Sequence, residues 1–289
     1  MMLQNPLFLY AMVIFSWSTS WLPLSWQASA VVPEVGVLHR FIIATPLMAL
    51  LAWRASQGFR FELKYHIAFM GLGLCLFSTN FTLFYYGSLY VASGLLAVAF
   101  ATASLINILL TALKEGKAPP LPQLIASVIG LSGVGLVFLP EVMASGAGFS
   151  GLLFCIFGTL FFSTGNVLSS SLQKRQIPVL SSSSWGMFYG AVGLLLFSLI
   201  RGHDLSPAMT APYIGGLLWL SVFSSVLAFA CYLTLVGKIG AGKAGYVTII
   251  FPVFALLIST VIEGYEWTIS ALIGITLVVI GNILMMRAK

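Results

Sequence analysis

The chain is built from long apolar runs, and the length of these runs is its strongest structural constraint. About 20 mostly apolar residues form a helix that crosses the roughly 30 Å hydrocarbon core of a bilayer. A transmembrane β-barrel would instead show alternating segments of about ten residues. We therefore predict an all-α polytopic membrane protein. Its ten transmembrane helices are expected at residues 6–27, 33–53, 65–88, 91–113, 121–139, 149–172, 180–200, 212–236, 243–262 and 268–286.

Charged residues make up only 7% of the chain, against about a quarter in a typical soluble domain. No segment is therefore expected to form a soluble domain. The first apolar run begins close to Met1 without a basic leader or cleavage site, so we expect a retained first helix. Cys75, Cys155 and Cys231 lie in separate spans with no C-x-x-C pair, which indicates neither a disulfide framework nor a metal site. We expect no cofactor.

Basic residues show which side of the membrane each loop faces. Eleven of the thirteen Lys and Arg residues fall in the inner loops and tail if the N-terminus is cytoplasmic. The positive-inside rule then places both termini inside. This bias explains the net charge of +6 without a nucleic-acid partner. The inner residues are Arg54, Arg60, Lys64, Lys114, Lys117, Lys174, Arg175, Lys238, Lys243, Arg287 and Lys289, whereas the outer loops hold only Arg201.

Two shifts of the sequence against itself indicate an internal repeat. Five spans per copy is an odd number, so the copies, residues 1–145 and 146–289, would have opposite orientations. Inverted repeats are typical of secondary transporters, which bind substrate near the midplane between the copies. A shift of 148 residues carries Gly94 onto Gly242, Glu115-Gly116 onto Glu263-Gly264 and Gly133 onto Gly281; a shift of 145 carries Trp17 onto Phe162, Thr19 onto Thr164 and Pro33 onto Pro178.

Several motifs resemble the drug/metabolite transporter superfamily. They are "WST" in the first span, "PEVGVLHRF" entering the second, "YGSLYVASGLLA" into the fourth, and "GLSGVGLVFL" in the fifth. The second copy, "GKAGYVTIIFPVFALLISTVIEGYEW", resembles the EamA-type ten-helix exporters, and among these the YddG-like aromatic amino-acid exporters. This resemblance implies export of amino acids from a bacterial cytoplasm. The ninth span has a proline at Pro252, but its partner in the fourth span is Ser104, so the sequence gives no reason for a kink there.

Aromatic and polar residues inside the spans are the candidate substrate site, because lone polar groups in hydrocarbon should face a cavity or another helix. Trp17 and Trp21 are four residues apart and share a helix face. Phe162 is the repeat equivalent of Trp17, so the two rings are expected to flank a central cavity; the alternative is that Trp17 only fills the core. The further candidates are Asn80, Phe81, Phe84 and Tyr85 in the third span, Phe100 in the fourth, Ser163 and Asn166 in the sixth, and Tyr246 in the ninth.

His39 and Arg40 are the only ionisable pair well inside a span. The Arg40 guanidinium is suited to binding a substrate carboxylate through two parallel hydrogen bonds. Alternatively, the long side chain snorkels to the outer headgroups. His39 is the one group inside a span that titrates near physiological pH, so any proton coupling would use it, water or the substrate.

All seven carboxylates lie at span ends or in loops. Their absence from the span interiors disfavours a proton-coupled antiporter of cationic drugs, an intramembrane aspartyl protease and a Mg²⁺-dependent prenyl transferase. No phosphate-binding G-x-x-x-x-G-K-[ST] motif is found either. We therefore predict a secondary transporter, not an enzyme, that exports aromatic and other apolar amino acids and related metabolites by alternating access. The alternative is a multidrug or other small-metabolite exporter of the same fold. The expected partners are a small-molecule substrate and the bilayer. We expect a monomer, in which the small residues Gly186 and Gly190 let helices of the same chain pack closely.

Overall fold

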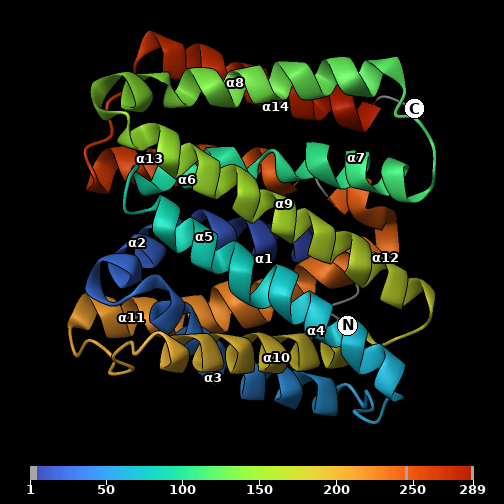
Figure 1. Cartoon of the computed structure of the whole chain (residues 1–289). Helices are drawn as coiled ribbons and strands as arrows, with labels where there is room; N and C mark the ends of the chain where they lie inside the picture. Colours follow the sequence, from blue (N-terminus) through green and yellow to red (C-terminus); the bar gives the residue numbers. More distant parts are fainter. Residues whose placement is uncertain (1–4, 245–246, 288–289) are drawn as a thin grey trace.

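The computed structural model of the protein describes residues 5–244 and 247–287. In this part of the chain every regular element is a helix, and the axes of the long helices lie along or oblique to one common axis of the molecule (Figure 1). The elements are α1 (Pro6–Ser18), α2 (Trp21–Ala30), α3 (Pro33–Arg54), α4 (Leu63–Leu74), the π-helical η2 (Cys75–Thr79), α5 (Asn80–Gly87), α6 (Ser93–Phe100), α7 (Ala103–Lys114), α8 (Leu121–Ser145), α9 (Ala147–Lys174), α10 (Val179–Ile200), α11 (Ala211–Trp219), the π-helical η3 (Leu220–Leu227), α12 (Ala228–Ala244), α13 (Val247–Ile262) and α14 (Ile269–Arg287).

These elements agree with an all-α polytopic membrane protein. Eight helical segments in the described residues are long and apolar enough to cross a bilayer. Two shorter apolar helices, Ile250–Ile262 and Ile269–Leu284, occupy the places of the ninth and tenth predicted spans. The total of ten spans, the inverted repeat and the two-repeat division stay predictions.

Most predicted span ends lie within a few residues of the observed ends, but two differ more. The fifth span was expected to end at residue 139, yet α8 continues through Pro140 to Ser145. A proline inside a helix removes one backbone hydrogen bond and does not by itself end the helix. The end comes instead at Gly146, whose φ of 63° is left-handed. The eighth span likewise extends beyond residue 236, since α12 continues to Ala244.

Two spans are broken near their middle. The first span is interrupted between Ser18 and Trp21, and the fourth between Phe100 and Ala103. The fourth span therefore has a break without a proline. There the N–H of Thr102 binds the carbonyl of Ala99 at 3.1 Å, three residues back, which is the tighter 3₁₀ geometry. Both breaks lie beside the aromatic cluster described below.

Helices from distant parts of the chain pair along their lengths. In Figure 1, α8 and α14 lie side by side at the top and α3 and α10 at the bottom. Elsewhere α6 packs on α13, α5 on α9, and α1 on α12. The α8–α14 contact is close: a Cβ at Gly133 would lie 2.6 Å from the carbonyl oxygen of Gly274. Under the predicted repeat, α3 with α10, α6 with α13 and α8 with α14 are pairs of equivalent spans.

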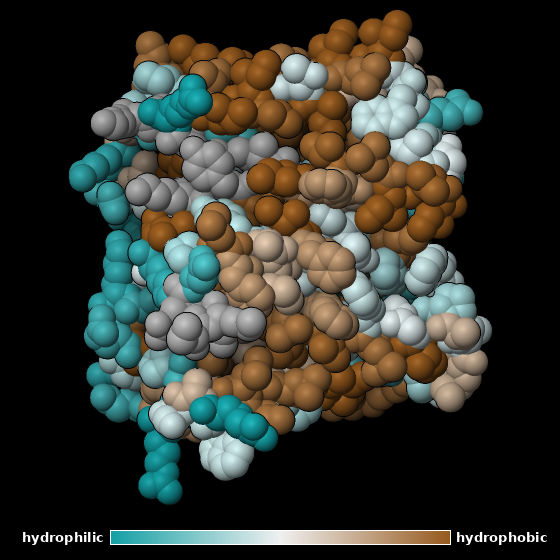
Figure 2. All heavy atoms as spheres, turned by 180° about the vertical axis from the view of Figure 1, so that it is seen from behind, coloured by the Kyte–Doolittle hydropathy of each residue, from teal (hydrophilic) through white to brown (hydrophobic). Residues whose placement is uncertain are grey.

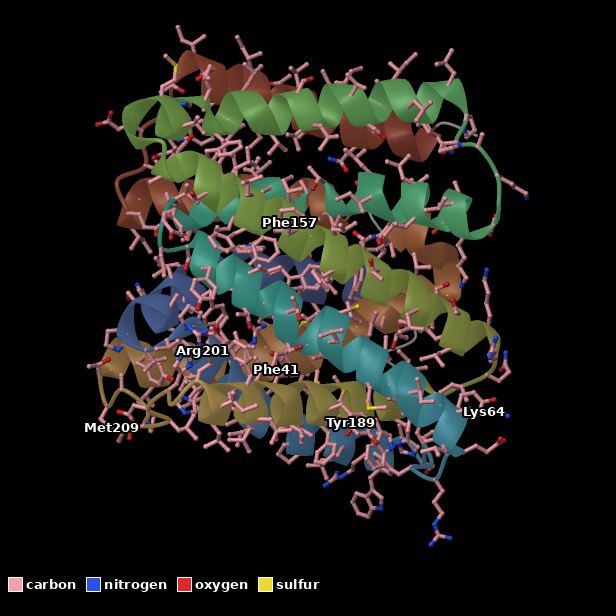
Figure 3. The ribbon with its side chains drawn as sticks, in the orientation of Figure 1. Phe41, Lys64, Phe157, Tyr189, Arg201 and Met209 are labelled. Atoms are coloured by element: carbon pink, nitrogen blue, oxygen red, sulfur yellow. The ribbon has the colours of Figure 1, made fainter. Side chains whose placement is uncertain are left out.

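The surface carries the apolar band that a membrane protein needs. Figure 2 shows apolar residues across the middle of one face and hydrophilic residues gathered along its left edge. In Figure 3, Lys64 lies at one end of the molecule and Arg201 and Met209 at the other. Phe157, between these ends, is 52% exposed. In the predicted topology the end with Lys64 is cytoplasmic, and we refer to it as the inner end.

Candidate functional site

Trp17 lies at the centre of an aromatic cluster that five spans build together. Its ring is contributed by α1, and its neighbours come from α6, α9, α12 and α13. Most of these contacts are edge-to-face, the geometry that aromatic quadrupoles favour. The ring centroids lie 5.8 Å from Phe100, 6.0 Å from Phe162, 5.8 Å from Phe229, 5.0 Å from Tyr232 and 5.9 Å from Phe251.

Trp21 extends this cluster toward the outer end. Its ring stacks on Phe251 with a centroid distance of 6.1 Å and lies 5.2 Å from Phe84 and 5.7 Å from Phe100. The break between α1 and α2 lies between the two tryptophans, yet both reach the same cluster. The indole N–H of Trp21 is buried and has no hydrogen-bond partner. A buried donor of this kind is costly unless a ligand or water binds it.

A small cavity lies among these rings. Its volume is about 30 Å³, which is room for about two water molecules. The central site is therefore almost closed in this conformation. Its lining includes eight of the predicted site residues, Trp17, Trp21, Arg40, Asn80, Phe81, Phe84, Phe100 and Phe162, together with Ser20, Leu24, Ser224 and Phe229.

Arg40 reaches this cavity from α3 and is only 1% exposed. Its guanidinium donates from Nε to the hydroxyl of Ser225 at 2.6 Å and from Nη2 to that of Ser224 at 2.9 Å. The ring of Phe81 lies 4.1 Å from Cζ, a cation–π contact. Among the residues that the structure describes, no carboxylate lies within ion-pair distance of Arg40. The side chain is thus held inside the protein and does not snorkel to the outer surface.

Asn80 adds an unpaired acceptor to the same cavity. Its side chain is 1% exposed, and its Oδ1 has no hydrogen-bond partner. Tyr85 lies behind the cavity lining, where its hydroxyl donates to Oε1 of Gln27 at 2.6 Å. The cavity therefore combines a held cation, a free N–H donor and a free amide oxygen with aromatic walls. This combination suits a small zwitterion that has an apolar side chain.

The other predicted residues lie outside the cavity lining. Ser163 donates to the carbonyl of Ala103 at 3.4 Å, and Asn166 belongs to a polar layer nearer the inner end. His39 uses both ring nitrogens elsewhere, with Nδ1 2.5 Å from the hydroxyl of Tyr213 and Nε2 2.9 Å from the carbonyl of Leu205. Its role in proton coupling stays a prediction. Tyr246 lies outside the described residues.

Sequence reasoning missed five residues of the site. Phe229 and Phe251 belong to the aromatic cluster, and Phe229 also lines the cavity, as do Ser20, Leu24 and Ser224. The repeat contained a signal for Phe229. The shift of 148 residues that aligns the fourth and fifth spans with the ninth and tenth also carries Phe81 onto Phe229, and Phe84 onto Tyr232. It likewise carries η2 onto part of η3. No comparable signal marks Ser224, since single serines are common in apolar helices.

In the described residues, no three His, Cys, Asp or Glu side chains gather where they could hold a metal ion. The carboxylates of Glu34 and Glu263 accept hydrogen bonds from side chains and backbone of other helices. Glu34 accepts from the hydroxyl of Tyr86 at 2.9 Å. Glu263 accepts from the N–H of Ser93 at 3.1 Å and from its hydroxyl at 2.6 Å. The latter contacts tie α6 to α13 at the outer end.

Comparison with known proteins places these features in a family context. Residues 149–287 match the model of the EamA-like transporter family. The chain is 25% identical to Protein PagO of Salmonella typhimurium over 97% of this chain and 92% of that protein. It is 27% identical to the uncharacterized transporter YvbV of Bacillus subtilis, over 94% and 88% of the two chains.

A crystal structure superposes on 97% of this chain and 96% of its own length, with a TM-score of 0.71 and 15% sequence identity. At that identity the likeness shows the fold alone. Over its second half the chain is thus similar to the EamA-like transporter family, and together the sequence matches indicate a membrane transporter of small metabolites. They name no substrate.

Proposed function

We propose that the protein is a secondary transporter that exports amino acids with apolar side chains, aromatic ones included, across a bacterial cytoplasmic membrane. The observation that carries the proposal is Arg40. It is a buried cation with no carboxylate partner among the described residues, and it lines an aromatic cavity. A charge in such a place is costly unless it is paired. The carboxylate of the substrate is the group best suited to pair with it.

The other groups of the cavity suit the rest of an amino acid. Ser224 and Ser225 hold the guanidinium in place, and the hydroxyl of Tyr85 lies beside it. A guanidinium has five N–H donors, so further N–H groups can bind the substrate carboxylate. The free Oδ1 of Asn80 is an acceptor for the ammonium group. The rings around Trp17 would surround the side chain. Because such walls distinguish single methylenes by only about 1–3 kcal/mol, we expect a broad preference among apolar side chains.

The closed cavity favours alternating access over a continuous pore. Space for about two waters cannot hold an amino acid, so binding requires the helices around the cavity to separate. The breaks beside the cluster, between α1 and α2 and between α6 and α7, are suited to such movement. One chain lines the whole cavity, and we therefore expect the monomer to be the functional unit.

The main alternative is an exporter of drugs or other small metabolites with the same fold. A lipophilic cation fits poorly, because it would enter a site that already contains the buried Arg40 cation. A small metabolite with a carboxylate is compatible with the same geometry. The substrate tests below separate these cases.

Counterflow in proteoliposomes tests the proposal. Vesicles are loaded with unlabelled phenylalanine, and uptake of a labelled trace is compared among wild type, Trp17→Ala and the control Trp26→Ala. Trp26 is 39% exposed and is not among the residues that line the cavity. We expect accumulation in wild type and in the control and its loss in Trp17→Ala. Absence of counterflow in wild type with phenylalanine and other neutral amino acids would overturn the substrate assignment.

Competition by analogues tests the role of Arg40. Phenethylamine keeps the ring and the ammonium group of phenylalanine but lacks the carboxylate. A site built to bind a polar group rejects an analogue without it strongly, so we expect phenethylamine to compete at least about a hundredfold less well. Equal competition would show that Arg40 does not bind the carboxylate. Stronger competition by a lipophilic cation than by phenylalanine would favour the drug exporter.

A further inference from the structure

A second and larger cavity opens near the inner end, and the proposed function does not yet use it. Its volume is about 540 Å³, which is in the range of small-molecule binding sites. It lies between the end of α7, the start of α8 and the end of α9, and we call it the inner vestibule. Its polar lining includes Asn107, Thr111, Lys114, Lys117, Ser171 and Lys174.

The inner vestibule has an excess of positive charge. Three lysines line it against one carboxylate, Glu115, which lies 3.9 Å from Lys117. Among the described residues no carboxylate lies within ion-pair distance of Lys114 or Lys174. The ammonium group of Lys114 contacts the hydroxyl of Ser171 instead. Lysines at helix C-termini are stabilised by the helix dipole even without a ligand, so the charges alone do not define a site.

Asn107 is the observation that points to a ligand. Its side chain is only 2% exposed, yet its Nδ2 has no hydrogen-bond partner, and the residue lines the inner vestibule. Its Oδ1 accepts from Nδ2 of Asn166 at 3.4 Å. A buried amide donor is costly when it is left unpaired. The amide faces the hydroxyl of Tyr232 and has no accessible surface of its own in this conformation, so an acceptor in the inner vestibule reaches it once the surrounding side chains move.

A layer of polar side chains connects the inner vestibule with the central cavity. Nδ2 of Asn166 also lies 3.4 Å from the hydroxyl of Tyr232. The ring of Tyr232 in turn lies 5.0 Å from that of Trp17. Asn107, Asn166 and Tyr232 are all buried. The three side chains therefore form a polar step between the two cavities.

We propose that the inner vestibule is the loading site for the carboxylate of a substrate that arrives from the cytoplasm. Lys114 and Lys174 attract the carboxylate, and the amide of Asn107 binds it when the polar layer moves. Movement of that layer then opens the way to Arg40. The inference rests on the proposed function and on the predicted inner orientation of this end. It adds a second binding site and names its residues.

Protection of an introduced cysteine tests this site directly. In a variant with Cys75, Cys155 and Cys231 replaced by alanine, Thr111→Cys places a thiol in the inner vestibule. Phenylalanine at millimolar concentration should slow modification of this thiol, and phenethylamine should not. Lys114→Gln with Lys174→Gln removes two charges. We expect the concentration of phenylalanine for half-protection to rise about three- to tenfold, since each nearby charge contributes modestly in a water-filled cleft.

Matched variants separate this inference from the proposed function. Arg54→Gln with Arg60→Gln removes two exposed charges from the same end but outside the inner vestibule, and should leave half-protection unchanged. Trp17→Ala should lose counterflow yet keep protection. Counterflow in wild type without any protection by phenylalanine would overturn the loading site and leave the proposed function intact. An equal effect of the two double variants would also overturn it.

The phosphate of a lipid headgroup is a second kind of anion that the lysines of the inner vestibule would attract. The protection experiment is therefore run in vesicles of phosphatidylcholine alone and in vesicles that also contain phosphatidylglycerol. Protection by phenylalanine in both compositions supports substrate loading. If the thiol is protected by phosphatidylglycerol and phenylalanine adds nothing, the site holds a lipid headgroup and the inference is wrong.

Discussion

Glu263 closes the outer end of the molecule, and its removal should expose the central cavity to the outside. Its carboxylate accepts two hydrogen bonds from Ser93, at the start of α6, and one from Ser259 in α13, the helix that ends just before Glu263. Only the two bonds to Ser93 are lost when α6 and α13 separate. A buried hydrogen bond to a charged group contributes about 1.5–3 kcal/mol.

Glu263 is exposed to water, so this value must be reduced. Once water competes for the carboxylate, each of the two bonds contributes about 0.5–1 kcal/mol. Glu263→Ala should then favour the outward-open conformation by about 1–2 kcal/mol, which is about a five- to thirtyfold change in its population. Glu263→Gln keeps an acceptor oxygen without the charge, and its effect should be intermediate.

Thiol labelling from outside measures this change. Leu24 lines the central cavity and is 3% exposed, so Leu24→Cys reports outward opening in the variant without native cysteines. An impermeant maleimide should label it about five- to thirtyfold faster with Glu263→Ala. Glu266→Ala, in the same loop, is the control. If Glu263→Ala leaves the labelling rate unchanged, or Glu266→Ala raises it equally, the two bonds to Ser93 do not hold the outer end closed.

Two further predictions concern packing and pH. Gly133→Leu should lower the midpoint of thermal unfolding in detergent, because a Cβ at Gly133 would lie 2.6 Å from the backbone of Gly274 and overpacking costs about 1–3 kcal/mol. The control Gly135→Leu is at a position with open space around it and should not lower the midpoint. An equal loss in both variants would contradict the close α8–α14 contact. His39→Gln should flatten the pH profile of counterflow if the predicted proton coupling uses this residue. An unchanged profile would show that the contacts of its ring nitrogens with Tyr213 and with a carbonyl, both away from the central cavity, are structural.

The spans could be predicted from the sequence because their length is fixed by an external dimension, the thickness of the bilayer. The breaks inside the spans could not. A break loses only one or two backbone hydrogen bonds, and Thr102 recovers one with the carbonyl of Ala99. Such a small difference is decided by packing between helices and leaves little trace in local composition. Thus Pro140 lies within a continuous helix, whereas the fourth span breaks without a proline.

The site was predictable only in part, for a related reason. The repeat paired Trp17 with Phe162, and their ring centroids lie 6.0 Å apart. The positions of Arg40 and Asn80 inside spans also predicted a functional role, because polar residues are rare and costly there. The partners of Arg40 could not be found in this way. Ser224 and Ser225 lie far along the chain, and their importance comes from the packing of α3 against η3.

The unpaired charge of Arg40 has a consequence for the transport cycle. With substrate bound, the carboxylate neutralises the guanidinium, and the cavity can close around a paired ion. Without substrate, the empty protein must close around a buried cation that hydroxyls and the rings of Phe41 and Phe81 contact but that no carboxylate of the described residues pairs with. An unpaired buried charge is costly. We therefore expect the empty protein to change conformation more slowly than the loaded one, so that exchange of phenylalanine across the membrane is faster than its net efflux.

Parallel assays of efflux into buffer with and without external phenylalanine measure this difference. Arg40→Gln removes the charge and should bring the two rates closer together, even if both fall. Equal rates in wild type would show that the empty protein closes without difficulty, and would remove the reason to regard the substrate carboxylate as the missing partner of Arg40.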